Sequence, residues 1–209
     1  MVASATHIPA TSCLPLRWGV KEKVTEEVSV QSFSLVSGSN RLLPLEPSDA
    51  SDLEELLTQA RLCSLNGMTD RNVDADACRQ RLSDVLKTRI TYGLQTWKIV
   101  DEADVPVGVC GFSVAEETSE INLFYCFTAR AMGRDPDLAR RVCRDVIDSF
   151  FRATYFTHLI CTARRGDHQL QRHLETLGFA YRETRQIGRH LVDVHQVLSP
   201  VVAQYLEAG

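Results

Sequence analysis

The sequence lacks the patterns that identify several large classes of protein. No apolar run approaches the roughly 18 to 20 residues of a membrane-spanning helix. The first residues, MVASATHIPATSCLPL, lack the charged region and apolar block of a secretory signal. No basic stripe is present, because 23 basic and 27 acidic residues are mixed along the chain and give a net charge of -4. We therefore expect a cytoplasmic protein with neither a membrane nor a nucleic acid as its partner.

The cysteines show neither a disulfide pattern nor a metal pattern. There are seven of them, scattered along the chain, without a C-x-x-C pair and without a cysteine and histidine spacing that suits zinc. We expect reduced core thiols and no metal.

The 209 residues, 44% of them hydrophobic, are enough for one main core with an appendage. Residues 1–40 are expected to form an N-terminal extension that is mobile to about residue 23, because that part is rich in Ser, Thr, Ala and Pro, and then a strand. Residues 41–198 are expected to form the main domain, and residues 199–209 a C-terminal tail.

Alternation and helical spacing predict the elements of the chain. The first half is expected to hold strands over 27–36 and 41–45, helices over 50–63 and 74–89, and a hairpin of strands over 97–101 and 105–114. The second half is expected to hold strand 120–127, helix 137–155, strand 157–163, helix 167–177, and strands 179–183 and 190–198. Gly178 stands where a left-handed helix cap is expected. This order indicates an α/β (α+β) fold with a mixed sheet.

The stretch 120–139, EINLFYCFTARAMGRDPDLA, is typical of a strand, a short turn containing Gly133, and the start of a helix. Such a connection directs unpaired N–H groups and the positive end of the helix dipole at one point, which favours a phosphate. An ordinary connection from strand to helix has the same appearance and is more common when this stretch is considered alone.

Three further segments accompany the Gly133 turn: RLLPLEPSDASDLEELL, WKIVDEADVPVGVCGF and HLETLGFAYRE. Together they resemble the GCN5-related N-acetyltransferases (GNATs), most closely the branch that acetylates ribosomal-protein N-termini, over residues 41–198. The resemblance implies a GNAT-like mixed central sheet that is splayed between its fourth and fifth strands and flanked by helices. It also implies acetyl-CoA as a co-substrate in that gap, with its pyrophosphate on the turn after the fourth strand.

The phosphate motif of this family is Gln or Arg, two variable residues, Gly, one variable residue, then Gly or Ala. Arg130 and Gly133 conform to the motif, whereas Asp135 and Asp137 place carboxylates where small residues are usual. An exposed carboxylate at about 4 Å would repel a phosphate by something like 1 kcal/mol. The resemblance assigns co-substrate binding to Phe127, Thr128, Arg130, Gly133, Arg134, Asp135, Leu138, Ala139, Asp167 and Arg172.

The resemblance also implies candidates for the catalytic acid and base. Leu170 stands where the ribosomal branch has a serine that protonates the departing thiolate, which leaves Tyr125 or His168 for that role. Asn122 stands at the frequent strand-four acid, which leaves Glu120, two residues earlier on the same face, as the base. The ordinary alternatives are a core tyrosine, a surface histidine and a solvated glutamate.

Two functions stay open at this point. The first is an N-acyltransferase that moves an acetyl group from acetyl-CoA to a primary amine of a small molecule or a protein. The second is a GNAT-fold protein that has lost or exchanged acetyl transfer and serves in binding or assembly, or uses another donor. The departures from the family pattern favour the second function: Asp135, Asp137, Asn122 and Leu170. A homodimer is left open, and His158, within an apolar strand, is expected to be structural.

Overall fold

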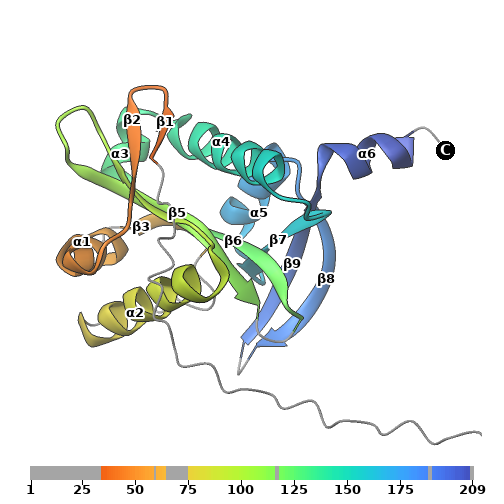
Figure 1. Ribbon diagram of the computed structural model, residues 1–209, viewed down its shortest axis with the longest axis horizontal. Coiled ribbons are helices and arrows are strands. Elements are labelled where there is room, and N and C mark those ends of the chain that lie inside the picture. Colours follow the sequence, from red (N-terminus) through yellow and green to blue (C-terminus); the bar gives the residue numbers. More distant parts are fainter. Residues whose placement is uncertain (1–33, 59, 65–74, 116–117, 188–189, 208–209) are drawn as a thin grey trace, which may run out of the picture.

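The computed structural model describes residues 34–58, 60–64, 75–115, 118–187 and 190–207 (Figure 1). Within these residues, one mixed sheet has the strand order β1-β2-β4-β5-β6-β7-β9-β8, and β3 pairs with β6 off this path. The strands are β1 (Leu35–Ser37), β2 (Asn40–Pro44), β3 (Ala60–Cys63), β4 (Thr96–Val100), β5 (Pro106–Ala115), β6 (Glu120–Thr128), β7 (His158–Arg164), β8 (Ala180–Ile187) and β9 (His190–Leu198).

Helices cover the two faces of the sheet (Figure 1). On one face lie α4 (Leu138–Ala153) and α5 (His168–Thr176), and on the other lie α1 (Ala50–Thr58) and α2 (Ala75–Tyr92). The larger core forms under α4, whose buried side chains recur at helical spacing: Leu138, Ala139, Val142, Cys143, Val146, Ile147 and Phe150. A smaller core under α1 and α2 contains Leu45, Val109, Phe124 and Cys126. Two further short helices are η1 (Pro47–Asp49) and α3 (Ala129–Arg134).

The expected splay lies between β6 and β7, and its geometry is confirmed. These two strands are the parallel pair of the sheet, because the chain crosses from one to the other through α3 and α4. Their register consists of a single pair, Asn122 with Ile160, whereas β5 and β6 are in register over eight pairs. Beyond Asn122 the two strands therefore diverge and leave an edge of β6 unpaired with β7.

The prediction of one helix over 50–63 is wrong. Helix α1 ends at Thr58, and Ala60 to Cys63 form strand β3, which pairs antiparallel with the end of β6. The apolar residues of this segment fit either structure, since short apolar runs do not distinguish helix from strand. The edge of β6 that β7 leaves open decides the outcome, because its backbone groups need partners.

The hairpin of β4 and β5 is confirmed, and two of its glycines are explained by close approaches. A Cβ atom on Gly108 would lie 2.8 Å from the carbonyl oxygen of Cys126, and one on Gly111 would lie 2.6 Å from Thr96 Oγ1. The expected left-handed cap after α5 is also confirmed, since Gly178 has a φ of +86°.

The ends of the chain differ from the expectation. Strand β1 begins at Leu35, and the predicted strand residues 27–33 lie outside the described residues. The expected C-terminal tail contains a helix, α6 (Pro200–Glu207), that projects from the body of the molecule (Figure 1). In the part of the chain that the structure describes, no helix is both long and apolar enough to cross a membrane.

Truncation tests the boundary of the core. Deleting residues 1–23 is expected to leave the melting temperature unchanged, because that part lacks apolar periodicity. Deleting residues 1–36 is expected to cost roughly 1 to 2 kcal/mol of unfolding free energy, because it removes Leu35, which packs on the main core, and two of the three register pairs of β1 with β2. Thermal melts of both truncations check this. If the shorter deletion alone unfolds the protein, the predicted boundary is wrong.

Candidate functional site

The site forms where β6 and β7 diverge, and strand β3 already occupies the exposed edge of β6. The register pairs Ala60 with Thr128, Leu62 with Phe127 and Cys63 with Cys126. The next residue, Ser64, continues the contact: its backbone N–H donates to the carbonyl of Tyr125 at 2.8 Å, and its Oγ accepts from the N–H of Tyr125 at 2.9 Å. The backbone groups that would hold a ligand in this gap are therefore bonded to the chain itself.

The segment after β6 forms the short helix α3 in place of the short turn that was expected. Thr128 caps α3, because its Oγ1 accepts a hydrogen bond from the N–H of Ala131 at 3.2 Å. Gly133 lies inside α3, is exposed, and would present an added Cβ atom to open space. The prediction of a short turn containing Gly133 is wrong, because this residue lies in a helix, but its exposed surface leaves room for a ligand to approach the backbone.

The carboxylates at the start of α4 are neutralised by arginines. Asp135 Oδ2 lies 2.8 Å from Arg141, and its Oδ1 accepts from the N–H of Asp137 at 3.1 Å. Asp137 receives two hydrogen bonds from Arg140, at 2.6 and 3.0 Å, which lower the pKa of that carboxyl group. Asp135 thus supplies the negative charge that the positive end of α4 favours, and a pyrophosphate at this place would compete with it.

Some of the other residues assigned to co-substrate binding are buried, and some are exposed. Phe127, Leu138 and Ala139 are buried, whereas Arg130 and Arg134 are exposed. The two arginines line a cavity of about 180 Å³ together with Thr128, Asp135, Asn40 and Asp101. Residues with hydroxyl, guanidinium and carboxylate side chains therefore line one cavity at the end of β6. The hydroxyl and guanidinium groups suit a phosphate, whereas the carboxylates would repel it.

The residues of α5 have structural contacts. Asp167 caps this helix by accepting from the N–H of Leu170 at 3.0 Å. His168 is exposed and bonds Gln171 at 3.1 Å, and Arg172 is exposed and donates to the carbonyl of His168 at 3.2 Å. These contacts do not direct Asp167, His168 or Arg172 to the gap, so their assigned roles remain predictions.

Tyr125 is the sequence candidate whose surroundings best suit chemistry. Its ring is fully buried, and among the described residues its hydroxyl has no hydrogen-bond partner. Burial, followed by the nearby Cys161, Cys143 and Cys63, raises its pKa well above the ordinary value, so the hydroxyl remains a proton donor. A buried donor without a partner carries a desolvation cost, which a bound ligand can relieve.

His173 lies beside Tyr125 and was missed by the sequence reasoning. The two rings are 5.4 Å apart between centroids in an edge arrangement, and His173 Nε2 has no partner in the described part of the chain. Burial lowers the pKa of His173 to about 4, so the imidazole is neutral near pH 7. The sequence held one signal for the burial of His173. This residue precedes Leu174 and lies three residues after Leu170, so it lies near the apolar face of α5, where both leucines are buried.

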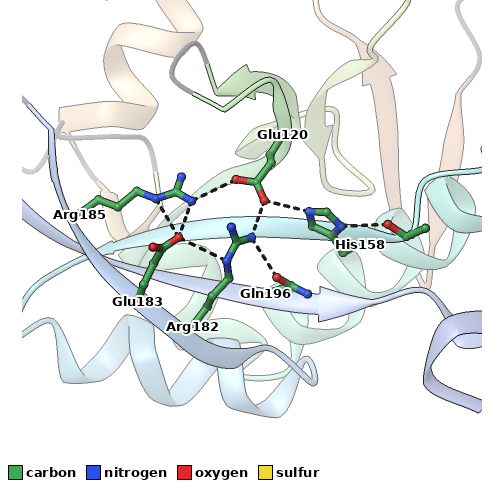
Figure 2. A network of polar contacts seen from close by, with 7 residues as sticks. Glu120, His158, Arg182, Glu183, Arg185 and Gln196 are labelled. Atoms are coloured by element: carbon green, nitrogen blue, oxygen red, sulfur yellow. Dashed lines mark hydrogen bonds and ion pairs between the residues drawn. The ribbon is translucent and has the colours of Figure 1, made fainter. Parts of the chain in front are cut away.

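Glu120 belongs to a network at the closed end of the gap (Figure 2). Its Oε1 bonds His158 at 2.9 Å and also Arg182, and its Oε2 bonds Arg185 at 3.2 Å. Glu183 pairs with both arginines, and Gln196 accepts from Arg182 at 3.0 Å. The contact of His158 with Glu120 is in keeping with a structural role for the histidine.

This network makes Glu120 a poor general base. Burial by itself would raise its pKa, but hydrogen bonds from Arg182, Thr118, His158 and Arg185 outweigh that effect and lower it to about 2. A base that works near neutral pH needs a pKa closer to 7. We therefore regard Glu120 as the ion-pair anchor that joins β6 to β7 and β8, in place of the catalytic role that the sequence suggested.

Comparisons with known proteins are consistent with this geometry. No curated protein matches the sequence. Among solved structures, an acetyltransferase (GNAT family) from Bacillus anthracis has a TM-score of 0.62 at 10% identity, covering 80% of this chain and 99% of that one. The ribosomal-protein-S5-alanine acetyltransferase from Vibrio fischeri has a TM-score of 0.59 at 13% identity, covering 81% and 98%.

A third neighbour was solved with the ligand expected here. This ribosomal L7/L12 alpha-N-protein acetyltransferase in complex with coenzyme A has a TM-score of 0.60 at 12% identity, covering 78% of this chain and 96% of that one. Identities this low establish the fold alone. The model of the acetyltransferase (GNAT) domain, however, matches residues 41–180, which is more than half of the sequence. The chain therefore belongs to the GNAT acetyltransferase family.

Proposed function

We propose that the protein is an acetyl-CoA-dependent N-acyltransferase that acetylates a primary amine of a small molecule or of a protein N-terminus. The observation that carries this proposal is the pair of buried polar atoms beside the gap, Tyr125 Oη and His173 Nε2, neither of which has a partner among the described residues. A ligand that brings a polar atom to this point would form a hydrogen bond there and remove the desolvation cost of an unpartnered buried group.

The reaction joins the amine nitrogen to the thioester carbonyl carbon and breaks the bond from that carbon to sulfur. In this proposal, the Tyr125 hydroxyl donates a hydrogen bond to the sulfur as negative charge develops on it. Because its pKa lies above that of a thiol, Tyr125 stabilises the thiolate without giving up its proton outright. Because His173 is neutral near pH 7, it does not repel the positive charge of an incoming ammonium group. The amine proton passes to water, since Glu120 is too weak a base to take it.

The pantetheine chain of acetyl-CoA would lie along the edge of β6, and its pyrophosphate would approach Gly133, Arg130 and Arg134 in α3, next to the start of α4. Gly133 leaves open space there, and both arginines are exposed. Two features oppose this placement: Asp135 stands at the positive end of α4, and β3 lies on the edge of β6. The same two features favour the second candidate function, a GNAT-fold protein that no longer transfers acetyl groups.

A peptide assay tests the proposed function. The protein is incubated with acetyl-CoA and a set of primary amines, including peptides with a free N-terminus, and acetylated products are measured by mass spectrometry. The matched control is each peptide with a blocked N-terminus and no lysine. Acetylation of a free amine supports the proposal, and its absence for every amine, with no binding of acetyl-CoA, would favour the second function.

Asp135→Asn is expected to tighten the binding of acetyl-CoA about five-fold, because it removes roughly 1 kcal/mol of repulsion from a phosphate. The asparagine side-chain oxygen can still accept from the N–H of Asp137, so the start of α4 keeps its contact. Asp148→Asn is the matched control, since it makes the same charge change at an exposed position further along α4. Calorimetry measures both. Weaker binding by Asp135→Asn would mean that Asp135 helps to hold the ligand.

A further inference from the structure

The structure places two thiols at the point where β3 meets β6. Cys63 and Cys126 are direct register partners in this antiparallel pair, and both are thiols in the structure. Their side chains are in hydrogen-bond contact. Directly opposed residues of antiparallel strands have Cα atoms about 4.5 to 5.5 Å apart, which lies within the range of about 4.4 to 6.8 Å that a disulfide requires. A bond between these sulfurs therefore needs little movement of the backbone.

Strand β3 is held less firmly than the strands within the sheet. It pairs with β6 along one edge over three register pairs, with an irregularity between Ala60 and Leu62, whereas β5 is paired on both edges. Ser64 adds three hydrogen bonds with Tyr125, the third being a long one of 3.4 Å from its hydroxyl to the Tyr125 carbonyl. Short pairings of this kind open locally at a smaller cost than global unfolding. Opening β3 would expose the edge of β6 and take Leu62 out of the main core, while the other members of that core lie outside β3.

We propose that β3 is a removable strap that competes with acetyl-CoA for the edge of β6, and that a disulfide between Cys63 and Cys126 fixes it in the closed position. This inference rests on the proposed function for its ligand. In the reduced protein the strap exchanges between closed and open forms, and acetyl-CoA binds the open form. In the oxidised protein the open form is not accessible, so the binding site is shut.

The oxidation step is a thiol–disulfide exchange with a small disulfide such as oxidised glutathione. The thiolate of Cys63, which is the more accessible of the pair, attacks one sulfur of the oxidant and releases one thiol. Cys126 then loses its proton and attacks the sulfur of Cys63, which forms the protein disulfide and releases the second thiol. Two protein thiols are oxidised, and one small disulfide is reduced to two thiols.

The test compares full-length protein in the reduced form and after incubation with oxidised glutathione. Peptide mapping is expected to find the cross-link between Cys63 and Cys126. Calorimetry is expected to show at least ten-fold weaker binding of acetyl-CoA after oxidation, and reversal by a dithiol reductant. In Cys63→Ser the oxidant is expected to leave the affinity unchanged. Failure of the cross-link to form, or equal affinity of the oxidised and reduced forms, would overturn the proposal.

Two further measurements do not depend on the disulfide. Ser64→Ala removes the contact of Oγ with the N–H of Tyr125 and is expected to tighten acetyl-CoA binding by about five-fold. The amide of Tyr125 is expected to exchange with solvent faster than the amides of β5. If Tyr125 exchanges as slowly as β5 and Ser64→Ala binds no more tightly, β3 is a permanent strand and the proposal is wrong.

One outcome separates this inference from the proposed function. If the cross-link forms and Tyr125 exchanges quickly, but neither wild type nor Ser64→Ala binds acetyl-CoA at millimolar concentration, the proposed function is overturned. The movement of β3 and its redox control would stand in that case, with another ligand for the exposed edge.

Discussion

Tyr125→Phe is expected to lower the rate of acetyl transfer by roughly 10²-fold without destabilising the protein. Loss of one preorganised donor to a developing negative charge costs about 10² to 10³ in rate, and we expect the lower end because a thiolate is a good leaving group. The removed hydroxyl is buried and has no partner in the described residues, so its loss should leave the unfolding free energy unchanged or raise it by about 1 kcal/mol.

The two readouts together distinguish a catalytic tyrosine from a structural one. Tyr181→Phe serves as the matched control, because that residue is 60% exposed and its hydroxyl bonds the exposed Thr184 of β8, 3.1 Å away. Its rate and stability should both stay close to wild type. A Tyr125→Phe protein with an unchanged turnover number, or one destabilised by more than about 2 kcal/mol, would show that the hydroxyl has a structural partner and no part in the chemistry.

Glu120→Gln is expected to cost about 3 kcal/mol of unfolding free energy at pH 7. The glutamate side chain is only 12% exposed and bonds Arg182, Arg185 and His158, so the neutral amide leaves two guanidinium groups without their carboxylate. A fall of the pKa from 4.5 to about 2 corresponds to an energy of this size. Glu183→Gln is the matched control, and we expect it to cost less than about 1 kcal/mol, because Glu183 is 41% exposed.

The lowered pKa of Glu120 also predicts how the unfolding free energy changes with pH. Its pKa is lower in the folded protein than in the unfolded chain, so its contribution is fully present above about pH 4.5 and is lost as the pH falls toward 2. Denaturant titrations between pH 7 and pH 2.5 should show this loss in wild type and a shallower one in Glu120→Gln. A drop in turnover of 10²-fold, with stability and its pH dependence unchanged, would instead identify Glu120 as the base.

The fold could be predicted where the chain sets its own local structure. Helix α4 buries the residues that its spacing indicated, and the hairpin of β4 and β5 follows from two β-rich runs around an acidic turn. Strand β3 could not be predicted in the same way. Residues 60 to 63 form a strand because β7 leaves the edge of β6 open, which is a consequence of the whole sheet. The structure of residues 60 to 63 is therefore determined by pairing with β6 and not by the residue pattern of the segment.

The site could be predicted only in part for the same reason. Arg130 and Gly133 could be proposed from the sequence because they lie within one short motif after a strand, and their role in binding stays a prediction. The contacts that decide the role of Glu120 come from His158, Arg182 and Arg185, which are 38 to 65 residues further along the chain. In the sequence, Glu120 is a carboxylate at the start of a strand with no basic residue nearby in the chain. In the fold, both of its oxygens bond these distant residues.

The affinity of acetyl-CoA for reduced wild type and for Gly133→Leu shows whether the pyrophosphate binds at α3. A Cβ atom at Gly133 meets nothing within 4 Å in the described part of the chain, so the side chain should leave the fold intact, as a thermal melt can verify. If the pyrophosphate approaches this backbone, wild type should bind acetyl-CoA and Gly133→Leu should bind at least ten-fold more weakly at the same melting temperature. Equal affinity of the two proteins, or no binding by wild type at millimolar acetyl-CoA, would show that acetyl-CoA does not bind at α3.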